Sequence, residues 1–480
     1  MISSGFPPAP GRGGPFAGTA APSGKNAVAQ ADAPRAGCSD PKKEASMSRW
    51  LLAVASLAFL APLARAEAPA PGAPDAAAVA RYVAEARAVS DADAGRLWGR
   101  ALYGPLLFVD PATRRVVANQ ADAQGRLAPT AGGLFAGRLT DDAGAANTAT
   151  TWSGVRWTML VLPMPDGADD RRETLAHEMW HRVQDGLGFP PTDALPRHLD
   201  EPQGRLWLRL EWRALSAALR ASGAERRRAV ADALLFRARR RALYGAEAAE
   251  TERALEMNEG LAQYTGVRLG QTDPRAAAAR AAAMIEGVPS YVRSFAYASG
   301  PLYGLLLDDA APGWRKGLTA KDDLGARLGA ALGLVPAADV AKEADARALV
   351  YGGPALRQEE ERRAERLAAR LAAYRARLVD GPALIIPNED ANFEFDPRDV
   401  TPLGDAGDAY PHLRVAGAWG VLDARDGARI AAGFSAFVVP APKDPAARPL
   451  AGDGWTLALN SGWTLAPAKR AGDFVVRRAK

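Results

Sequence analysis

The sequence predicts an α+β protein: a mainly α-helical region with a small N-terminal β-sheet, followed by a small all-β C-terminal domain. Two observations support this prediction. Apolar residues recur at helical spacing through most of residues 67–380, and strand-like runs occur only near the start of this segment. After residue 380 the chain changes to short β-type runs separated by Gly, Pro, Asp and Asn. We therefore expect two folded regions, 67–380 and 381–480.

An apolar run over 51–63 lies between Arg49 and the tripeptide Ala64-Arg65-Ala66. A basic start, an apolar stretch too short to span a bilayer and a small-residue cleavage site are typical of a secretory signal peptide. We predict a signal peptide over 47–66 and a secreted or periplasmic protein that begins near Glu67.

Met47 directly precedes this segment, which suggests that translation begins there. Residues 1–46 are rich in Pro, Gly and Ala, and we interpret them as a mis-assigned or disordered extension. They contain the only cysteine, Cys38. The exported chain would then have no thiolate, so His, Asp and Glu would have to bind any metal.

The bulk composition excludes some partners. The chain of 480 residues has 60 Lys and Arg against 55 Asp and Glu, for a net charge of +5. No segment interleaves aromatic and basic residues as a nucleic-acid groove does, so we expect no nucleic-acid partner. No segment after the signal peptide reaches 18 apolar residues, so we expect no stable membrane insertion.

Local patterns predict the elements in chain order. A helix is expected over 77–100, then a hairpin of strands 106–110 and 115–118, a Gly/Ala/Asp-rich loop, and a strand over 152–163 that ends at a Pro-Asp-Gly turn. Helices are expected over 169–186, 205–244 (one or two), 246–269, 276–287, 291–308 and 358–378.

The C-terminal strands are expected over 383–387, 413–422, 430–439, 455–459 and 463–465. The last two each carry Trp-Thr-Leu and flank Asn460-Ser461-Gly462. This pattern predicts a hairpin in which the two Trp-Thr-Leu segments pair across the strands.

The helix over 169–186 contains the motif His177-Glu178-Met179-Trp180-His181. Residues four apart lie on one face of a helix, so both imidazoles can reach one ion. Glu178 can then activate the water held at the open position of a zinc ion (Zn²⁺) and pass its proton to a leaving amine. No further histidine is well placed, because His198 follows a Pro-rich loop and His412 lies in the C-terminal β region. A carboxylate from a later helix is the remaining source of a third ligand.

The segment Glu256-Met257-Asn258-Glu259-Gly260-Leu261-Ala262 offers that carboxylate. With the preceding motif it resembles the gluzincin zinc metallopeptidases, whose second helix carries an Asn-Glu-Gly/Ala segment. The resemblance implies a zincin-like fold over 67–380, with His177, His181 and Glu259 as metal ligands. Glu256, one turn earlier, is the rival ligand; it could instead be an outer partner of an imidazole or a solvated carboxylate. Gln263 is a further candidate for an outer partner.

A third segment, Tyr297-Ala298-Ser299-Gly300, resembles the Tyr-x-x-Gly helix of aminopeptidase N-like gluzincins. The resemblance implies that Tyr297 donates a hydrogen bond to the oxyanion of the reaction. Tyr303 and Tyr264 are the fallback candidates, and a core tyrosine is the alternative. A Gly-x-Met-Glu-Asn segment is missing from the sequence, so recognition of a free substrate N-terminus is not implied.

The expected function is hydrolysis of peptide bonds in a peptide or protein substrate by metal-activated water, with Glu178 and Tyr297 as catalytic residues. The strand over 152–162 is expected to border the cleft and to pair with an extended substrate. Two alternatives stay open: a catalytically silent envelope binding or scaffold protein on the same fold, and a zinc hydrolase of a non-peptide bond.

Overall fold

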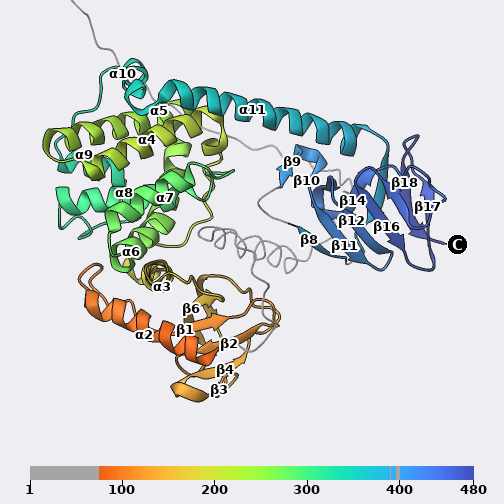
Figure 1. The fold of residues 1–480 in the computed structure, drawn as a ribbon, viewed down its shortest axis with the longest axis horizontal. Helices are drawn as coiled ribbons and strands as arrows, with labels where there is room; N and C mark the ends of the chain where they lie inside the picture. Colours follow the sequence, from red (N-terminus) through yellow and green to blue (C-terminus); the bar gives the residue numbers. More distant parts are fainter. Residues whose placement is uncertain (1–74, 390, 396–399, 480) are drawn as a thin grey trace, which may run out of the picture. The chain divides into compact units, whose positions relative to one another are not determined.

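The computed structural model describes residues 75–389, 391–395 and 400–479. The predicted signal peptide over 47–66 and the extension over 1–46 lie outside these residues. The described chain is α+β, with helices dominating up to residue 380 and strands thereafter (Figure 1). In the described part no helix has the length and apolar character needed to cross a membrane.

The N-terminal region is a helix and a six-stranded sheet. Helix α2 (Ala76–Asp93) begins at Asp75, whose carboxylate accepts a hydrogen bond from the Ala77 amide. The strand order is β3-β4-β2-β1-β6-β5, with β1 and β6 parallel and the other pairs antiparallel. The strands are β1 Leu106–Val109, β2 Arg115–Ala118, β3 Ala128–Pro129, β4 Phe135–Arg138, β5 Thr148–Trp152 and β6 Val155–Val161.

The strands β1 and β6 read as continuous apolar runs because they are buried on both faces. Leu106 and Phe108 point into the main helical core, whereas Leu107 and Val109 pack into a smaller core on the opposite face. The predicted hairpin of β1 and β2 is confirmed. The segment expected to be a loop contains β3, β4 and β5, whose short sequences rich in Ala, Gly and Thr carry little apolar alternation.

The helical region follows the sheet. Gly245, with φ 82° and ψ −169°, interrupts the long helix α5, and a π-helical turn at Glu256–Gly260 leads directly into α6. The helices are α3 Ala168–Val183, α4 Pro202–Arg220, α5 Gly223–Leu255, α6 Leu261–Gly270, α7 Pro274–Ile285, α8 Phe295–Ala310, α9 Leu324–Ala331, α10 Val340–Ala348 and α11 Gly353–Arg375. Shorter 3₁₀ turns include Gln184–Leu187 and Arg197–Asp200.

Glycines let three helical segments approach one another at backbone distance. A Cβ on Gly266 of α6 would lie 2.7 Å from the Glu173 carbonyl oxygen of α3. A Cβ on Gly300 of α8 would lie 2.1 Å from the carbonyl oxygen of Gly260. Larger residues at these positions would push the helices apart. Helix α6 is therefore held close to α3, and the turn at 256–260 is held close to α8.

The C-terminal region has two mainly antiparallel sheets. They share a separate hydrophobic core, formed by residues between Leu384 and Val476. The seven-stranded sheet has the order β17-β18-β7-β14-β13-β10-β9, and the five-stranded sheet has the order β15-β16-β12-β11-β8. The strands are β7 Ala383–Pro387, β8 Asn392–Phe395, β9 Thr401–Pro402, β10 Asp408–Tyr410, β11 Leu413–Gly417, β12 Gly420–Ala424, β13 Ala428–Ile430, β14 Ala436–Pro440, β15 Leu450–Gly452, β16 Trp455–Leu459, β17 Trp463–Pro467 and β18 Phe474–Arg478.

The predicted hairpin around Asn460 is wrong. Strand β16 pairs with β12 and β15, whereas β17 pairs with β18 in the other sheet. The Asn460 amide and side chain donate hydrogen bonds to the carbonyls of Trp419 and Ala418, in the turn between β11 and β12. The segment Asn460-Ser461-Gly462 therefore carries the chain from the five-stranded sheet to the seven-stranded sheet, and the two Trp-Thr-Leu segments do not pair.

Candidate metal centre

The two histidines of the motif meet on one face of α3. Their Nε2 atoms lie 3.1 Å apart. His177 is buried and His181 is largely buried, with 6% and 13% of their side chains exposed. The helical spacing of four residues accounts for this geometry, because it places the two rings a turn apart on one face, where they meet edge to face.

Glu259 completes the cluster from the π-helical turn. Its Oε2 atom lies 3.6 Å from His177 Nε2 and 3.5 Å from His181 Nε2. These three residues form the one group of His, Cys, Asp and Glu in the described chain whose ligand atoms could hold a metal ion. A π-turn, a rare element that is frequent at functional sites, thus presents the carboxylate to the histidines.

The three ligand atoms fit a small tetrahedral ion. Zinc bonds of about 2.0–2.1 Å at tetrahedral angles would separate neighbouring ligand atoms by about 3.3 Å. The observed separations are 3.1, 3.5 and 3.6 Å. Two imidazoles and one carboxylate are also a common ligand set of catalytic zinc, with one position left for another ligand.

Hydrogen bonds to the side-chain oxygens of two glutamines orient the imidazoles. His177 Nδ1 lies 2.8 Å from Gln263 Oε1, and His181 Nδ1 lies 2.6 Å from Gln184 Oε1. An amide oxygen only accepts, so each Nδ1 donates and each Nε2 is left with a lone pair for a metal. Gln263, which the sequence suggested as an outer partner of a ligating imidazole, thus contacts His177.

Gln184 is the residue that the sequence reasoning missed. Its Nε2 donates to Asn258 Oδ1 at 2.9 Å, and the Asn258 amide donates to Glu259 Oε1 at 3.2 Å. A chain of hydrogen bonds therefore runs from His181 to Glu259 around the cluster. Gln184 follows His181 by three residues, and residues three apart on a helix are neighbours; this spacing could have indicated the contact.

Glu178 is a buried carboxylate without a hydrogen bond to one of its oxygens. Its Oε2 atom has no partner within the described part of the chain, and its Oε1 atom lies 3.9 Å from His177 Nε2. Burial raises the pKa of Glu178, although the neighbouring histidines oppose this shift. An unpaired carboxylate of raised pKa beside the cluster is suited to accept a proton.

Tyr297 contacts the cluster from α8. Its hydroxyl donates to Glu259 Oε2 at 2.7 Å, and its ring stacks on that of His177 with 5.5 Å between centroids. The fallback tyrosines point elsewhere: Tyr303 donates to Glu211, and Tyr264 donates to Asp308.

Glu256 does not reach the histidines. It is fully buried, and the Arg237 guanidinium donates to both of its oxygens. Neither the rival-ligand role nor the solvated-carboxylate interpretation is therefore correct, because tertiary packing supplies Glu256 with a partner from α5. His198 is likewise distant from the cluster and forms a hydrogen bond with Glu252.

The charges within the cluster are strongly coupled. Burial alone would lower the pKa of His181, but the Glu259 carboxylate outweighs it and raises this pKa to about 9. Burial alone would raise the pKa of Glu259, but His181 and His177 bring it well below its usual value. The geometry therefore favours a positive charge at this point, either a proton or a metal ion.

The cluster opens into a cavity of about 210 Å³. His177, Glu178, His181 and Glu259 form part of its wall, and the other lining residues are Asn147, Thr148, Ala149, Arg156, Gln184, Pro191 and Asn258. The strand at the edge of the sheet beside the cavity is β5, whereas the sequence predicted that the strand over 152–162 would form this edge. Most of the predicted strand is β6. It is an inner strand, because β5 pairs with it on the side that would otherwise be free.

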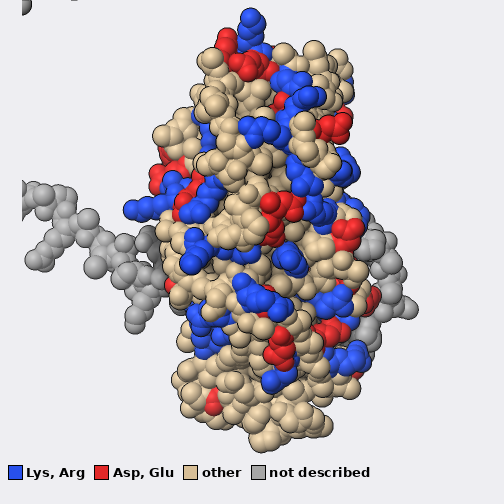
Figure 2. Space-filling view, turned by 90° about the vertical axis from the view of Figure 1, so that its left-hand side faces the viewer, with Lys and Arg blue, Asp and Glu red and all other residues tan. Residues whose placement is uncertain are grey.

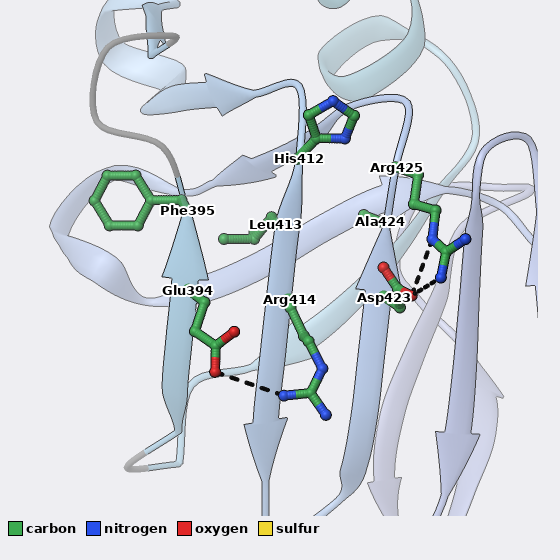
Figure 3. Close-up of a pocket in the computed structure, with 8 residues that line it drawn as sticks. All are labelled: Glu394, Phe395, His412, Leu413, Arg414, Asp423, Ala424 and Arg425. Carbon is green, nitrogen blue, oxygen red and sulfur yellow. Dashed lines mark hydrogen bonds and ion pairs between the residues drawn. The ribbon is translucent and has the colours of Figure 1, made fainter. Parts of the chain in front are cut away.

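A second hollow, of about 480 Å³, lies on the C-terminal sheet between β8, β11 and β12 (Figure 3). Its charged side chains pair with one another, Arg414 with Glu394 and Arg425 with Asp423. His412 lines this hollow and belongs to no metal-binding group among the described residues.

Comparison of the chain with protein-family models, curated proteins and solved structures gave no match. The geometry of the cluster and the cavity is therefore the basis on which a function can be proposed.

Proposed function

We propose that the protein is an exported zinc metallopeptidase of the gluzincin kind, with a zincin-like fold over 67–380. The observation that carries the proposal is the convergence of His177, His181 and Glu259, with the unpaired carboxylate of Glu178 beside them in one cavity. This combination provides a site for a metal ion together with a general base.

A zinc ion bound there would act as a Lewis acid, polarising a carbonyl oxygen and lowering the pKa of water toward neutrality. Glu178 takes the proton of the attacking water at its free Oε2 atom and passes it to the leaving amine. Its raised pKa brings proton uptake and release closer to neutral pH. Gln184 and Gln263 hold the imidazoles in the tautomer that keeps Nε2 available.

Strand β5 is suited to bind an extended peptide. It is the edge of the six-stranded sheet, and Thr148 and Ala149 line the cavity beside the cluster. An edge strand offers unpaired backbone N–H and C=O groups, to which a substrate backbone can add. This favours a peptide over other substrates of a zinc hydrolase.

The decisive experiment combines metal analysis with cleavage profiling of a peptide mixture. We expect the purified protein to bind one zinc ion and to cleave peptides. Glu178→Gln should retain the zinc and lose about 10²–10⁴-fold in activity. Zinc binding without cleavage would favour the scaffold alternative, and cleavage of ester or amide probes alone would favour a non-peptide hydrolase.

Tyr297→Phe tests which role this tyrosine has. A fall in kcat of about 10²–10³-fold at unchanged zinc affinity indicates the oxyanion donor implied by the resemblance. The hydrogen bond to Glu259 favours a positioning role instead, for which zinc affinity should fall about 10- to 100-fold.

Export over 47–66 stays a prediction, and N-terminal sequencing should find a mature start near Glu67.

A further inference from the structure

The wall of the cavity carries one guanidinium group, that of Arg156 on β6. Arg156 lies opposite Thr151 of the edge strand β5. Its Nη2 atom donates to Asp185 Oδ2 at 3.1 Å, just beyond the end of α3. The remaining lining residues near β5 are neutral, namely Asn147, Thr148 and Ala149.

The ion pair of Arg156 leaves it free to bind a second anion. Both partners are about half exposed, with 42% of the Arg156 side chain and 52% of the Asp185 side chain accessible. Exposed pairs of this kind stabilise a protein only weakly, so another carboxylate can share or replace Asp185. A guanidinium has five N–H donors, and the pair with Asp185 occupies one nitrogen.

Two further arginines, Arg100 and Arg182, lie near Arg156. A Cβ on Gly186, next to Asp185, would lie 2.8 Å from Arg100 Nη1. Arg182 donates to the Leu102 carbonyl and has no carboxylate partner in the described chain, where its Nε atom is also unpaired. Arg100 and Arg156 lie close enough to Arg182 for their positive charges to repel its guanidinium group. Arg100, Arg156 and Arg182 therefore repel one another, and Asp185 is the carboxylate that pairs with Arg156.

We infer that Arg156 is a substrate-binding residue that selects peptides carrying a carboxylate at this end of the cavity. The inference depends on the proposed peptidase function and assigns its substrate class. A guanidinium recognises a carboxylate through paired N–H donors, and the surrounding positive charge strengthens that contact. The carboxylate is either the C-terminus of the substrate or an acidic side chain.

Matched peptides separate these two sources. The probes are acetylated octapeptides of Ala, Gly and Leu, with a single Glu or Gln moved through each position and with a C-terminal acid or amide. Equilibrium binding is measured by calorimetry on zinc-loaded protein carrying Glu178→Gln, which removes turnover. We expect a Glu peptide or a free-acid peptide to bind at least about tenfold more tightly than its neutral counterpart.

Arg156→Gln in the same background should abolish that preference and leave binding of the neutral peptides unchanged. Arg138→Gln is the matched control, because Arg138 is an exposed, ion-paired arginine of the same sheet that does not line the cavity. The inference is overturned if acidic and neutral peptides bind equally, if no peptide binds, or if Arg156→Gln weakens all peptides alike.

Cleavage of the same peptides by the wild-type protein is measured separately. Cleavage without regard to charge would overturn the Arg156 inference and support the peptidase proposal. Arg156-dependent binding without any cleavage would overturn the peptidase function and support the carboxylate site.

Discussion

Glu256 and Glu259 lie three residues apart on the same π-helical turn, yet they belong to two different electrostatic environments. Glu256 points into a cluster of arginines, where Arg237 donates to both of its oxygens. Glu259 points to His177 and His181 and receives a hydrogen bond from Tyr297. The Glu256 carboxylate has a permanent cation from the protein, whereas the cationic partners of Glu259 are two imidazoles, which carry a positive charge only when protonated.

The cluster around Glu256 balances its own charge almost completely. The carboxylates of Glu211, Glu252, Glu256 and Asp323 pair with the guanidinium groups of Arg237, Arg240 and Arg241. Tyr303 donates to Glu211, and His198 forms a hydrogen bond with Glu252. A buried carboxylate needs such a counter-charge, because desolvation strongly disfavours an isolated ion.

The difference between the two sites teaches where a metal ion can bind. A carboxylate already paired with arginine has little net negative charge to offer a cation, and the guanidinium engages a lone pair on each of its oxygens. Glu259 lacks a permanent cation, and in the metal-free protein a proton on His181 takes that place, as its raised pKa of about 9 indicates. A metal ion that displaces this proton compensates Glu259 in the same way that Arg237 compensates Glu256.

Replacing Glu256 or Glu259 by alanine should give the largest difference between the two sites. We expect Glu259→Ala to weaken zinc binding by more than the roughly 10- to 100-fold typical of an outer partner, because it removes a ligand. Glu256→Ala should keep the zinc and lower the unfolding free energy. Zinc content and competition with a chelating dye measure the first effect, and the assignment is wrong if Glu256→Ala releases the metal while Glu259→Ala retains it.

Removing the permanent cation should destabilise the fold. Arg237→Ala leaves the carboxylates of Glu256 and Glu211 without a partner in a buried site, so we expect a loss of about 3–5 kcal/mol in urea unfolding. Arg228→Ala is the control, since this arginine of the same helix is exposed, and its effect should stay within about 0.5 kcal/mol. Equal losses in both variants would contradict the role of the cluster.

The proton on His181 predicts a pH dependence confined to the metal-free protein. The folded-state pKa of about 9 lies above the usual 6.5, so the stabilisation is complete below pH 6.5 and is lost as the pH rises through 9. The loss should be on the order of 3 kcal/mol. Unfolding curves between pH 6 and 10, with and without zinc, measure it; the same slope in both series would refute the exchange of a proton for the metal.

The smallest expected effects concern the glutamines. Gln184→Ala and Gln263→Ala each remove the acceptor that orients one imidazole, and zinc affinity should fall about 10- to 100-fold. Gln203→Ala is the control, because its amide oxygen accepts from Trp207 and not from a histidine, and it should leave the affinity unchanged. An equal fall for Gln203→Ala would assign these effects to general packing.

The fold could be predicted where the apolar pattern was long. The helix with the histidine motif, the hairpin of β1 and β2 and the change to strands after residue 380 follow from local periodicity. Strand β5 could not be predicted, because Thr148–Trp152 is an edge strand with mostly small polar residues. The sheet exchange at Asn460 was also beyond reach, since its partners lie about forty residues earlier in the turn after β11.

The positions of charged side chains on the surface could likewise be predicted only in part from the sequence. Figure 2 shows Lys and Arg interspersed with Asp and Glu on the face that it presents, as the near balance of basic and acidic residues suggests. Composition could not indicate that Arg100, Arg156 and Arg182 lie near one another, with Arg156 paired to Asp185 at the cavity. That grouping depends on which loops and strands meet at the end of α3.

The sequence by itself determined the histidine pair and Glu178, because a spacing of four residues on a helix brings two imidazoles together whatever the rest of the chain does. It also narrowed the third ligand to Glu256 or Glu259. Only the tertiary structure decided between these two, because Arg237 of α5 neutralises one carboxylate while α3 presents two imidazoles to the other. A buried charge is assigned its role by the partner that folding brings to it, and that partner lies far away in the chain.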